Sequence, residues 1–314
     1  MLQECLESLA SRERNSLSQM TIDTAPRTPV SDFKGWATFI LLAFVWGGSF
    51  ILIKKGLIHF TAIEVGAIRI ALSAIAFVPI FLISKVKFPK GKVLLVTLVV
   101  LTGNGIPAFM FALAETRLGS AVTGVLNSLT PIFALLMGVF FFGTKLRRHH
   151  FTGLALGCIG IVVLMIGEKD WHVSSYVIFV VLGTLCYGLS ANLIKRYCQD
   201  VHPIAITTIG FFSLGLISLI ILGISGAYQK MTYPDVWIES LGPLFALALV
   251  CTVFANILFY WLIQRTTAVF GSAIAYAIPC MALVWGSLDG EIITWFQLAG
   301  FGFIIAAVYS LRRH

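Results

Sequence analysis

The sequence predicts an all-α polytopic membrane protein with ten transmembrane helices in two inverted five-helix repeats. Three observations predict this fold. Of the 314 residues, 58% are hydrophobic and 11% are charged, whereas a soluble domain carries about 25% charged residues. Ten apolar runs approach or reach the length needed to cross a bilayer core of about 30 Å. Two of these runs carry a central proline at matching places in the two halves.

The apolar runs follow one another through short connections, which leave no room for a domain outside the membrane. A run of about 20 apolar residues predicts one spanning helix, although the fifth and tenth runs are shorter. The expected spans are 36–56, 63–84, 93–114, 119–142, 151–167, 174–194, 203–224, 240–263, 268–288 and 293–310.

Residues 1–35 differ from the rest of the chain because they are rich in Ser, Thr, Arg and Glu and contain no sustained apolar run. They lack the apolar core of a secretory signal peptide, so we expect a disordered cytoplasmic tail. Met20 remains open as an alternative start. The predicted domains are this tail, a first repeat over 36–167 and a second repeat over 168–311.

The lysine and arginine residues predict the orientation in the membrane. With the N-terminus inside, sixteen of them lie on the cytoplasmic side, and five lie on the other side: Lys54, Lys55, Arg117, Lys169 and Lys230. This asymmetry places both termini in the cytoplasm. Most of the net charge of +8 therefore reflects the orientation in the membrane rather than a basic binding surface. For this reason we expect no nucleic-acid partner.

Five spans per half make the two halves cross the membrane in opposite senses. The fourth and ninth runs match, because each begins with small residues, has a central proline and ends at a glycine; Pro131 and Pro279 lie 148 residues apart. Proline frees a backbone carbonyl, and such irregular backbone is tolerated in a membrane only against protein or a water-filled cavity. Inverted repeats with interrupted helices are typical of secondary transporters, although a simple packing kink remains open for each proline.

Several stretches together resemble a known family. "FVWGGSFILIKKGL", "AIRIALSAIAF" and "LAETRLGSAVTGVLNSLTPIFALLMGVFFFG" resemble the first half of an EamA-type permease of the drug/metabolite transporter superfamily, and "QRTTAVFGSAIAYAIPCMALVWGSLDGEIITWFQLAGFGFIIAAVY" resembles the second. The resemblance covers about residues 36–310 and implies a ten-helix carrier that exports, or occasionally imports, small metabolites by alternating access. In one departure, Thr144 follows Gly143 where the family's first repeat usually has glutamate, which the second repeat keeps as Glu291.

A carrier needs polar groups near the middle of the membrane that meet substrate, water or each other. Pro107 follows an asparagine flanked by glycines, and it joins Pro131 and Pro279 as a candidate helix break. Singly, each polar residue has a structural explanation, as when Thr130 bonds back to its own backbone. Together they predict a polar, mostly uncharged and partly aromatic cavity lined by Trp46, Ser49, Asn104, Asn127, Thr130, Tyr187, Asn192, Asn256, Tyr260 and Tyr276.

Charged residues are scarce inside the spans. Arg69 lies near the outer end of the second span, and we expect its side chain to reach outward to the membrane surface. Pairing with Glu64 or Glu115, or contact with a substrate carboxylate, remains an alternative. Glu115, at the outer end of the third span, is the best candidate for coupling to a proton. The two histidines at 149–150 lie beside arginines and are interpreted as a solvated interface, so we expect neither a metal site nor a cofactor.

These features favour a secondary transporter, acting as an exporter, of small metabolites such as amino acids or related polar and amphipathic solutes. A phosphorylated-sugar or nucleotide-sugar carrier should need several buried basic residues, and only Arg69 is available. A membrane enzyme or receptor ranks third, because the sequence has no HExxH motif, no paired midplane carboxylates and no nucleotide-binding glycine loop. We expect a bacterial inner membrane location, with a small-molecule substrate, the lipid bilayer and a coupling proton or other ion as partners; a homodimer remains open.

Overall fold

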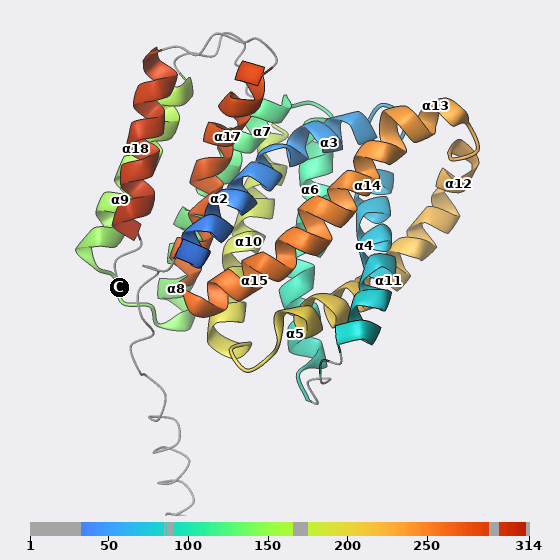
Figure 1. The fold of residues 1–314 in the computed structure, drawn as a ribbon, viewed down its shortest axis with the longest axis horizontal. Helices are drawn as coiled ribbons and strands as arrows, with labels where there is room; N and C mark the ends of the chain where they lie inside the picture. Colours follow the sequence, from blue (N-terminus) through green and yellow to red (C-terminus); the bar gives the residue numbers. More distant parts are fainter. Residues whose placement is uncertain (1–32, 85, 87–90, 166–174, 289–294, 312–314) are drawn as a thin grey trace, which may run out of the picture.

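The computed structural model describes residues 33–84, 86, 91–165, 175–288 and 295–311, and these residues form helices joined by short connections (Figure 1). The tail up to residue 32, Met20 and Glu291 lie outside the described residues. In the first half, the helices are α2 (Phe33–Gly47), α3 (Ser49–Gly56), α4 (Ala62–Ser84), α5 (Val93–Val100), the π-helix η1 (Leu101–Gly105), α6 (Ile106–Glu115), α7 (Ser120–Leu126), the 3₁₀-helix η2 (Asn127–Leu129), α8 (Thr130–Phe142) and α9 (Arg148–Met165).

The second half repeats this plan with an elongated eighth span. Its helices are α10 (Val177–Tyr197), α11 (Pro203–Ser225), α12 (Ala227–Lys230), α13 (Pro234–Val236), the π-helix η3 (Trp237–Leu241), α14 (Gly242–Ala248), the π-helix η4 (Leu249–Phe254), α15 (Ala255–Arg265), α16 (Ala268–Ser272), α17 (Ile274–Leu288) and α18 (Trp295–Leu311).

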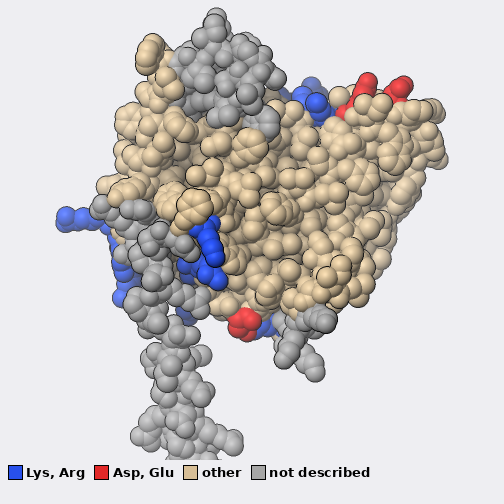
Figure 2. Space-filling view, viewed as in Figure 1, with Lys and Arg blue, Asp and Glu red and all other residues tan. Residues whose placement is uncertain are grey.

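The helices have the lengths and compositions of membrane spans. Within the described ranges, seven are long and apolar enough to cross a membrane, and three shorter apolar helices occupy the fifth, ninth and tenth places. Charged side chains gather toward the upper right and toward the left and lower part of the view in Figure 2, with a wide uncharged area between these regions. The predicted fold class, an all-α membrane protein with two five-helix halves, is therefore confirmed.

The two halves interlock rather than stand apart. The first span, α2–α3, packs against α14 and α17 of the second half, while its counterpart α10 packs against α6 and α8 of the first half. The second spans of each half, α4 and α11, pack together, and so do the fifth spans, α9 and α18, which lie side by side at the left of Figure 1. Equivalent helices of the two halves thus pack against equivalent helices of the opposite half, which is the arrangement expected of inverted repeats.

The first helices of the two halves also share a local sequence. Residues 46–55 read WGGSFILIKK and residues 187–196 read YGLSANLIKR, with Gly, Ser, Leu, Ile and Lys at the same places. The shared glycine and serine lie where the helix approaches its neighbours closely. A side chain at Gly188, for example, would begin 2.7 Å from the backbone nitrogen of Ala134. Only glycine allows α10 and α8 to approach this closely.

The third span of each half contains a matched π-helical turn. Leu101 begins η1 and Leu249 begins η4, and these residues lie 148 apart, the same separation as Pro131 and Pro279. A π-turn inserts one extra residue into the helical ladder and is frequent at functional sites. Both third spans are thus irregular at equivalent depths. Of these two turns, η1 is the one followed by a proline, Pro107, in the first turn of α6.

The fourth and ninth spans are interrupted in different ways. In the first half, the 3₁₀ segment η2 lies directly before Pro131, which sits in the first turn of α8. In the second half, the break between α16 and α17 falls at Ala273, and Pro279 lies inside α17. The α8 helix ends at Gly143, whose φ of 68° is left-handed, and Thr144 then donates its N–H to Gly138 at 2.9 Å.

Candidate functional site

A cavity lies where the two halves meet. Its volume is about 80 Å³, which is enough to hold water or part of a small solute. Spans from both halves line it, and eight residues singled out from the sequence reach it: Trp46, Ser49, Arg69, Asn104, Asn127, Thr130, Tyr187 and Asn256.

Two asparagines from opposite halves bind each other in the cavity wall. The amide nitrogen Nδ2 of Asn104 donates to Oδ1 of Asn256 at 3.0 Å, and Nδ2 of Asn256 donates to Oδ1 of Asn104 at 2.9 Å. Asn104 also donates to the hydroxyl of Tyr260 at 3.1 Å, and Asn256 donates to the carbonyl of Thr252 at 2.7 Å. Reciprocal amide bonds of this kind satisfy buried polar groups and join the third span to the eighth.

Aromatic side chains form much of the remaining wall. The indole N–H of Trp46 donates to the carbonyl of Cys251 within η4 at 2.8 Å, so the π-turn of one half holds the first helix of the other. The Trp46 ring meets Phe259 edge-on, with ring centroids 5.0 Å apart. Tyr187 stacks on Phe111 at 5.5 Å. These rings give the cavity apolar faces beside its amide groups.

Arg69 points into this cavity, so the expectation that it reaches outward is wrong. Its side chain is 8% exposed, and its Nε donates to the hydroxyl of Thr252 at 2.8 Å. The reason lies in the packing of α4, because residues 64–71 are all buried by neighbouring helices and offer no path to the membrane surface. Glu64 is not its partner either, since that carboxylate binds Lys230 at 2.6 Å.

Three predicted residues lie next to the cavity rather than on its surface. The Asn192 amide donates to the carbonyls of Ala134 and Gly188 at 2.7 and 2.8 Å and so ties α10 to α8. Tyr260 lies behind Asn104, and Tyr276 is fully buried against the place where Gly157 lets α9 approach. The side chain of Thr130 reaches the cavity but bonds back to the carbonyl of Asn127 at 2.7 Å, as expected.

Glu115 lies outside the cavity in a small cluster that we call the Glu115 latch, formed by Lys54, Glu115 and Ser120. Lys54 Nζ donates to the backbone carbonyl of Glu115 at 3.0 Å, and the Ser120 hydroxyl donates to Oε2 of Glu115 at 3.2 Å. The Glu115 side chain is completely buried, and its Oε1 has no hydrogen-bond partner within the described part of the chain. This latch joins α3, α6 and α7 at the predicted outer end.

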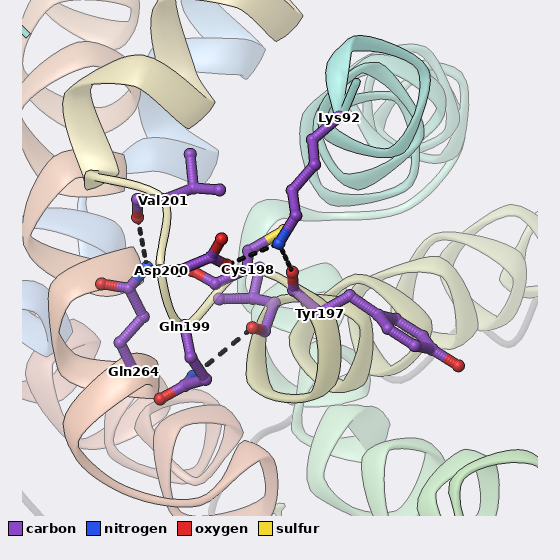
Figure 3. Close-up of polar contacts among 8 residues, drawn as sticks. Lys92, Tyr197, Cys198, Gln199, Asp200, Val201 and Gln264 are labelled. Atoms are coloured by element: carbon purple, nitrogen blue, oxygen red, sulfur yellow. Dashed lines mark hydrogen bonds and ion pairs between the residues drawn. The ribbon is translucent and has the colours of Figure 1, made fainter. Parts of the chain in front are cut away.

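The opposite end of the molecule has a matching cluster, the Gln264 latch, formed by Lys195, Gln264, Cys198 and Val201. Figure 3 shows the last three of these residues. Lys195 Nζ donates to the backbone carbonyl of Gln264 at 3.3 Å, and Gln264 Nε2 donates to the carbonyls of Cys198 and Val201 at 2.6 and 2.8 Å. Burial in this connection raises the pKa of the Cys198 thiol to about 11.

An ion pair borders the Gln264 latch. Lys92 Nζ lies 2.6 Å from Oδ1 of Asp200 and donates to the carbonyl of Tyr197 at 3.1 Å (Figure 3). The hydrogen bond from Lys92 lowers the pKa of Asp200 below its ordinary value. The pair connects the beginning of α5 to the end of α10.

Several cavity residues escaped the sequence analysis, although helical spacing could have found them. Each lies three or four positions from a residue already chosen, and residues at this spacing share a helix face. Phe50 follows Trp46 by four, Ser190 follows Tyr187 by three, and Phe259 follows Asn256 by three. Gly103 also lines the cavity. A larger residue would not fit there, because its Cβ would lie 2.5 Å from the Ser190 hydroxyl.

The described helices bring together no group of three or more His, Cys, Asp or Glu side chains that could hold a metal ion. The two histidines at 149–150 stack edge-on with ring centroids 4.3 Å apart at the beginning of α9. The chemistry of the cavity is therefore that of amides, hydroxyls, aromatic rings and one guanidinium group.

Comparison with known proteins gives a consistent result. The chain matches the EamA-like transporter family over residues 33–166 and 174–313. An uncharacterized transporter of Archaeoglobus fulgidus is 24% identical over 292 residues, covering 89% of this chain and 99% of the relative. A probable amino-acid metabolite efflux pump of Salmonella typhimurium is 24% identical, covering 86% of this chain and 92% of that pump.

Two further comparisons concern location and fold. An uncharacterized inner membrane transporter of Escherichia coli K12, YedA, is 24% identical and covers 85% of this chain and 87% of its own length. One solved structure matches with a TM-score of 0.67 and 15% sequence identity, covering 89% of this chain and 96% of that chain. This last likeness shows a shared fold.

Proposed function

Because this chain belongs to the EamA-like transporter family, we propose that it exports small polar or amphipathic metabolites, with amino acids as the leading class. The chain is an integral membrane transporter rather than an enzyme. The finer assignment to amino acids draws support from the Salmonella relative, which is named a probable amino-acid metabolite efflux pump. A bacterial inner membrane location with both termini in the cytoplasm is part of the same proposal.

The observation that carries this proposal is the cavity between the halves. Its wall combines the paired amides of Asn104 and Asn256 with the aromatic faces of Trp46, Phe111 and Tyr187. A small solute with polar and apolar parts would meet complementary groups on both sides. Secondary transporters with inverted repeats bind their substrates at this place, near the midplane and between the repeats.

The irregular segments around the cavity support alternating access. The π-turn η1 and the 3₁₀ segment η2 supply Gly103, Asn104 and Asn127 to the cavity wall. Backbone that departs from the α-helix offers places where a span can bend without losing its whole hydrogen-bond ladder. We therefore infer that these segments bend when the cavity changes the side to which it opens.

A phosphorylated-sugar carrier ranks below an amino-acid carrier. Phosphate recognition relies on several charged donors, and Arg69 is the one charged residue that lines the described cavity. The same panel of solutes can test both candidates, since sugar phosphates can be included beside amino acids.

The proposal predicts selective release of amino acids from loaded proteoliposomes, and a loss of that release when Pro131 becomes Ala. Pro131→Ala should restore a regular helix at η2 and impair release more than membrane insertion. Pro79→Ala is the matched control, because Pro79 lies inside α4 on an exposed surface away from the cavity. No release of any solute by folded protein, with and without a proton gradient, would contradict the proposed function.

A further inference from the structure

We propose that Arg69 is the docking point for a carboxylate group of the transported solute, which makes small monocarboxylates the substrate class of the cavity. Amino acids belong to this class through their α-carboxylate, and simple aromatic or aliphatic acids belong to it equally. The inference rests on the proposed function, because it assigns a ligand to the same cavity.

The first argument is the way in which the guanidinium group is held. Its Nε donates to Oγ1 of Thr252 at 2.8 Å, and that hydroxyl donates in turn to the carbonyl of Leu247 at 2.9 Å within the eighth span. Ser73 donates to the backbone carbonyl of Arg69 at 2.8 Å, one turn further along α4. The guanidinium is thus fixed by one edge, and its two terminal nitrogens make no hydrogen bond to any described residue.

The second argument is the absence of a counter-charge among the described residues. Glu64 is committed to Lys230 at 2.6 Å, and the Glu115 carboxylate accepts a bond from Ser120. The ion pairs of the described chain do not include Arg69. A buried cation without a partner is costly, and charged residues within membrane spans are typical of substrate pathways.

The third argument is geometric complementarity. Arginine presents a planar fork of N–H donors that matches a carboxylate through two parallel hydrogen bonds. With Nε already bound to Thr252, the two terminal nitrogens remain as the free side of that fork. A carboxylate placed there would satisfy both nitrogens and neutralise the charge at once, which no neutral group achieves.

The charge of the cavity also limits the solute to a single acidic group. The other described lining residues are uncharged, so a dianionic phosphate ester would retain an unmatched negative charge and a cationic solute would be repelled. The aromatic rings of Phe50, Phe111 and Phe259 offer apolar contact to the body of the solute. A monocarboxylate with an apolar or amino-acid body fits both conditions.

The test compares acids with their own amides on the purified full-length protein. L-phenylalanine is paired with L-phenylalaninamide, and 3-phenylpropanoate with 3-phenylpropanamide, and binding is measured by thermal stabilisation and by competition with release from proteoliposomes. Charge-assisted hydrogen bonds predict that each acid binds about 10-fold or more tightly than its amide. Arg69→Gln should remove this preference, and Arg69→Lys should keep part of it, because lysine retains the charge without the fork.

Lys55→Gln is the matched control, because Lys55 is an exposed basic residue at the same predicted end and outside the cavity wall. It should leave the acid preference unchanged. Equal binding of acids and amides by the unaltered protein would overturn the inference, and this comparison needs no variant to fold. An acid preference that survives in Arg69→Gln would overturn it as well.

Three further outcomes separate this inference from the function on which it rests. If chloride or phosphate protects the protein through Arg69 as strongly as the acids do, the site belongs to an inorganic anion and the inference is wrong. If acids and amides are released equally well, transport stands and only the role of Arg69 is lost. If no solute is released at all, the proposed function itself is contradicted.

Discussion

The two latches occupy equivalent places at opposite ends of the molecule, but their central side chains differ: one is a carboxyl group and the other an amide. In both, a lysine near the end of a first span donates to a backbone carbonyl at the end of a third span: Lys54 to Glu115 and Lys195 to Gln264. At the predicted inner end, the Gln264 amide donates to two carbonyls. At the predicted outer end, one carboxylate oxygen of Glu115 is buried without a partner.

This difference indicates that the two latches differ in stability although their backbone arrangements are similar. A neutral amide whose donors are used stabilises a closed connection by about 1 kcal/mol per hydrogen bond. A buried carboxylate with an unsatisfied oxygen instead destabilises the packing around it. We therefore expect the Gln264 latch to be the firmer of the two, and the following substitutions test that ranking.

The largest effect is expected when Gln264 becomes Glu, which gives the inner latch the carboxyl group of the outer one. A carboxylate oxygen would then face the carbonyls of Cys198 and Val201 in place of a donor. The buried repulsion should lower the free energy of unfolding by about 3 kcal/mol or more. The midpoint of thermal unfolding in detergent measures this loss, and Gln264→Met, which removes the donor without adding charge, should lose less. Equal losses would show that a carboxyl group at this place costs no more than the loss of the amide donor.

A moderate gain is expected when Glu115 becomes Gln, which gives the outer latch the neutral group of the inner one. The amide oxygen can still accept from Ser120, while the buried carboxyl group with an unsatisfied oxygen is replaced by a neutral amide. We expect the free energy of unfolding to rise by about 1–2 kcal/mol. Glu115→Asp retains the carboxyl group and should bring no gain in the same thermal measurement. A lower unfolding midpoint for Glu115→Gln would contradict the proposed ranking.

The smallest effect is expected at the ion pair beside the Gln264 latch. Lys92 and Asp200 are both partly exposed, and such pairs contribute about 0.2–1 kcal/mol. Because the hydrogen bond from Lys92 lowers the pKa of Asp200 in the folded protein, the stabilisation is present above the ordinary carboxylate pKa of about 4. It is lost as the pH falls through the lowered value.

Asp200→Asn should therefore lower the thermal midpoint slightly at pH 7 and progressively less as the pH falls below about 4. High salt should shrink the difference at pH 7, because the pair is accessible to ions. A difference that stays constant across pH would indicate that the Asp200 side chain acts through packing rather than through charge.

Most of the fold could be predicted from the sequence, because a membrane span requires a continuous run of hydrophobic residues and such a run is visible in the sequence itself. Ten apolar runs correspond to ten helical spans, and the proline in each half marked a span that is indeed interrupted. The type of interruption could not be predicted. Pro131 follows a 3₁₀ segment and Pro279 lies inside a helix, because neighbouring helices, and not the proline alone, determine where the backbone departs from the α-helix.

The candidate site was harder to predict because position along a helix does not fix which way a side chain points. Arg69 was expected at the membrane surface, yet packing of α4 on all sides of residues 64–71 turns it inward. The π-turn η4 was also invisible in the sequence, although it supplies the carbonyl that binds Trp46. Contacts between the halves decide both features, and a single sequence does not encode them in any local pattern.

The hydrogen bond from Trp46 to Cys251 has an optical consequence. It fixes an indole ring of one half to the backbone of the other, directly at the cavity wall. Indole emission responds to the polarity around the ring and to the hydrogen bond of its N–H group. Any motion that separates the halves must lengthen this bond and admit water to the ring. The molecule thus carries an indole at the joint between its repeats, and in a variant that keeps Trp46 as its single tryptophan, a shift in emission would report separation of the two halves.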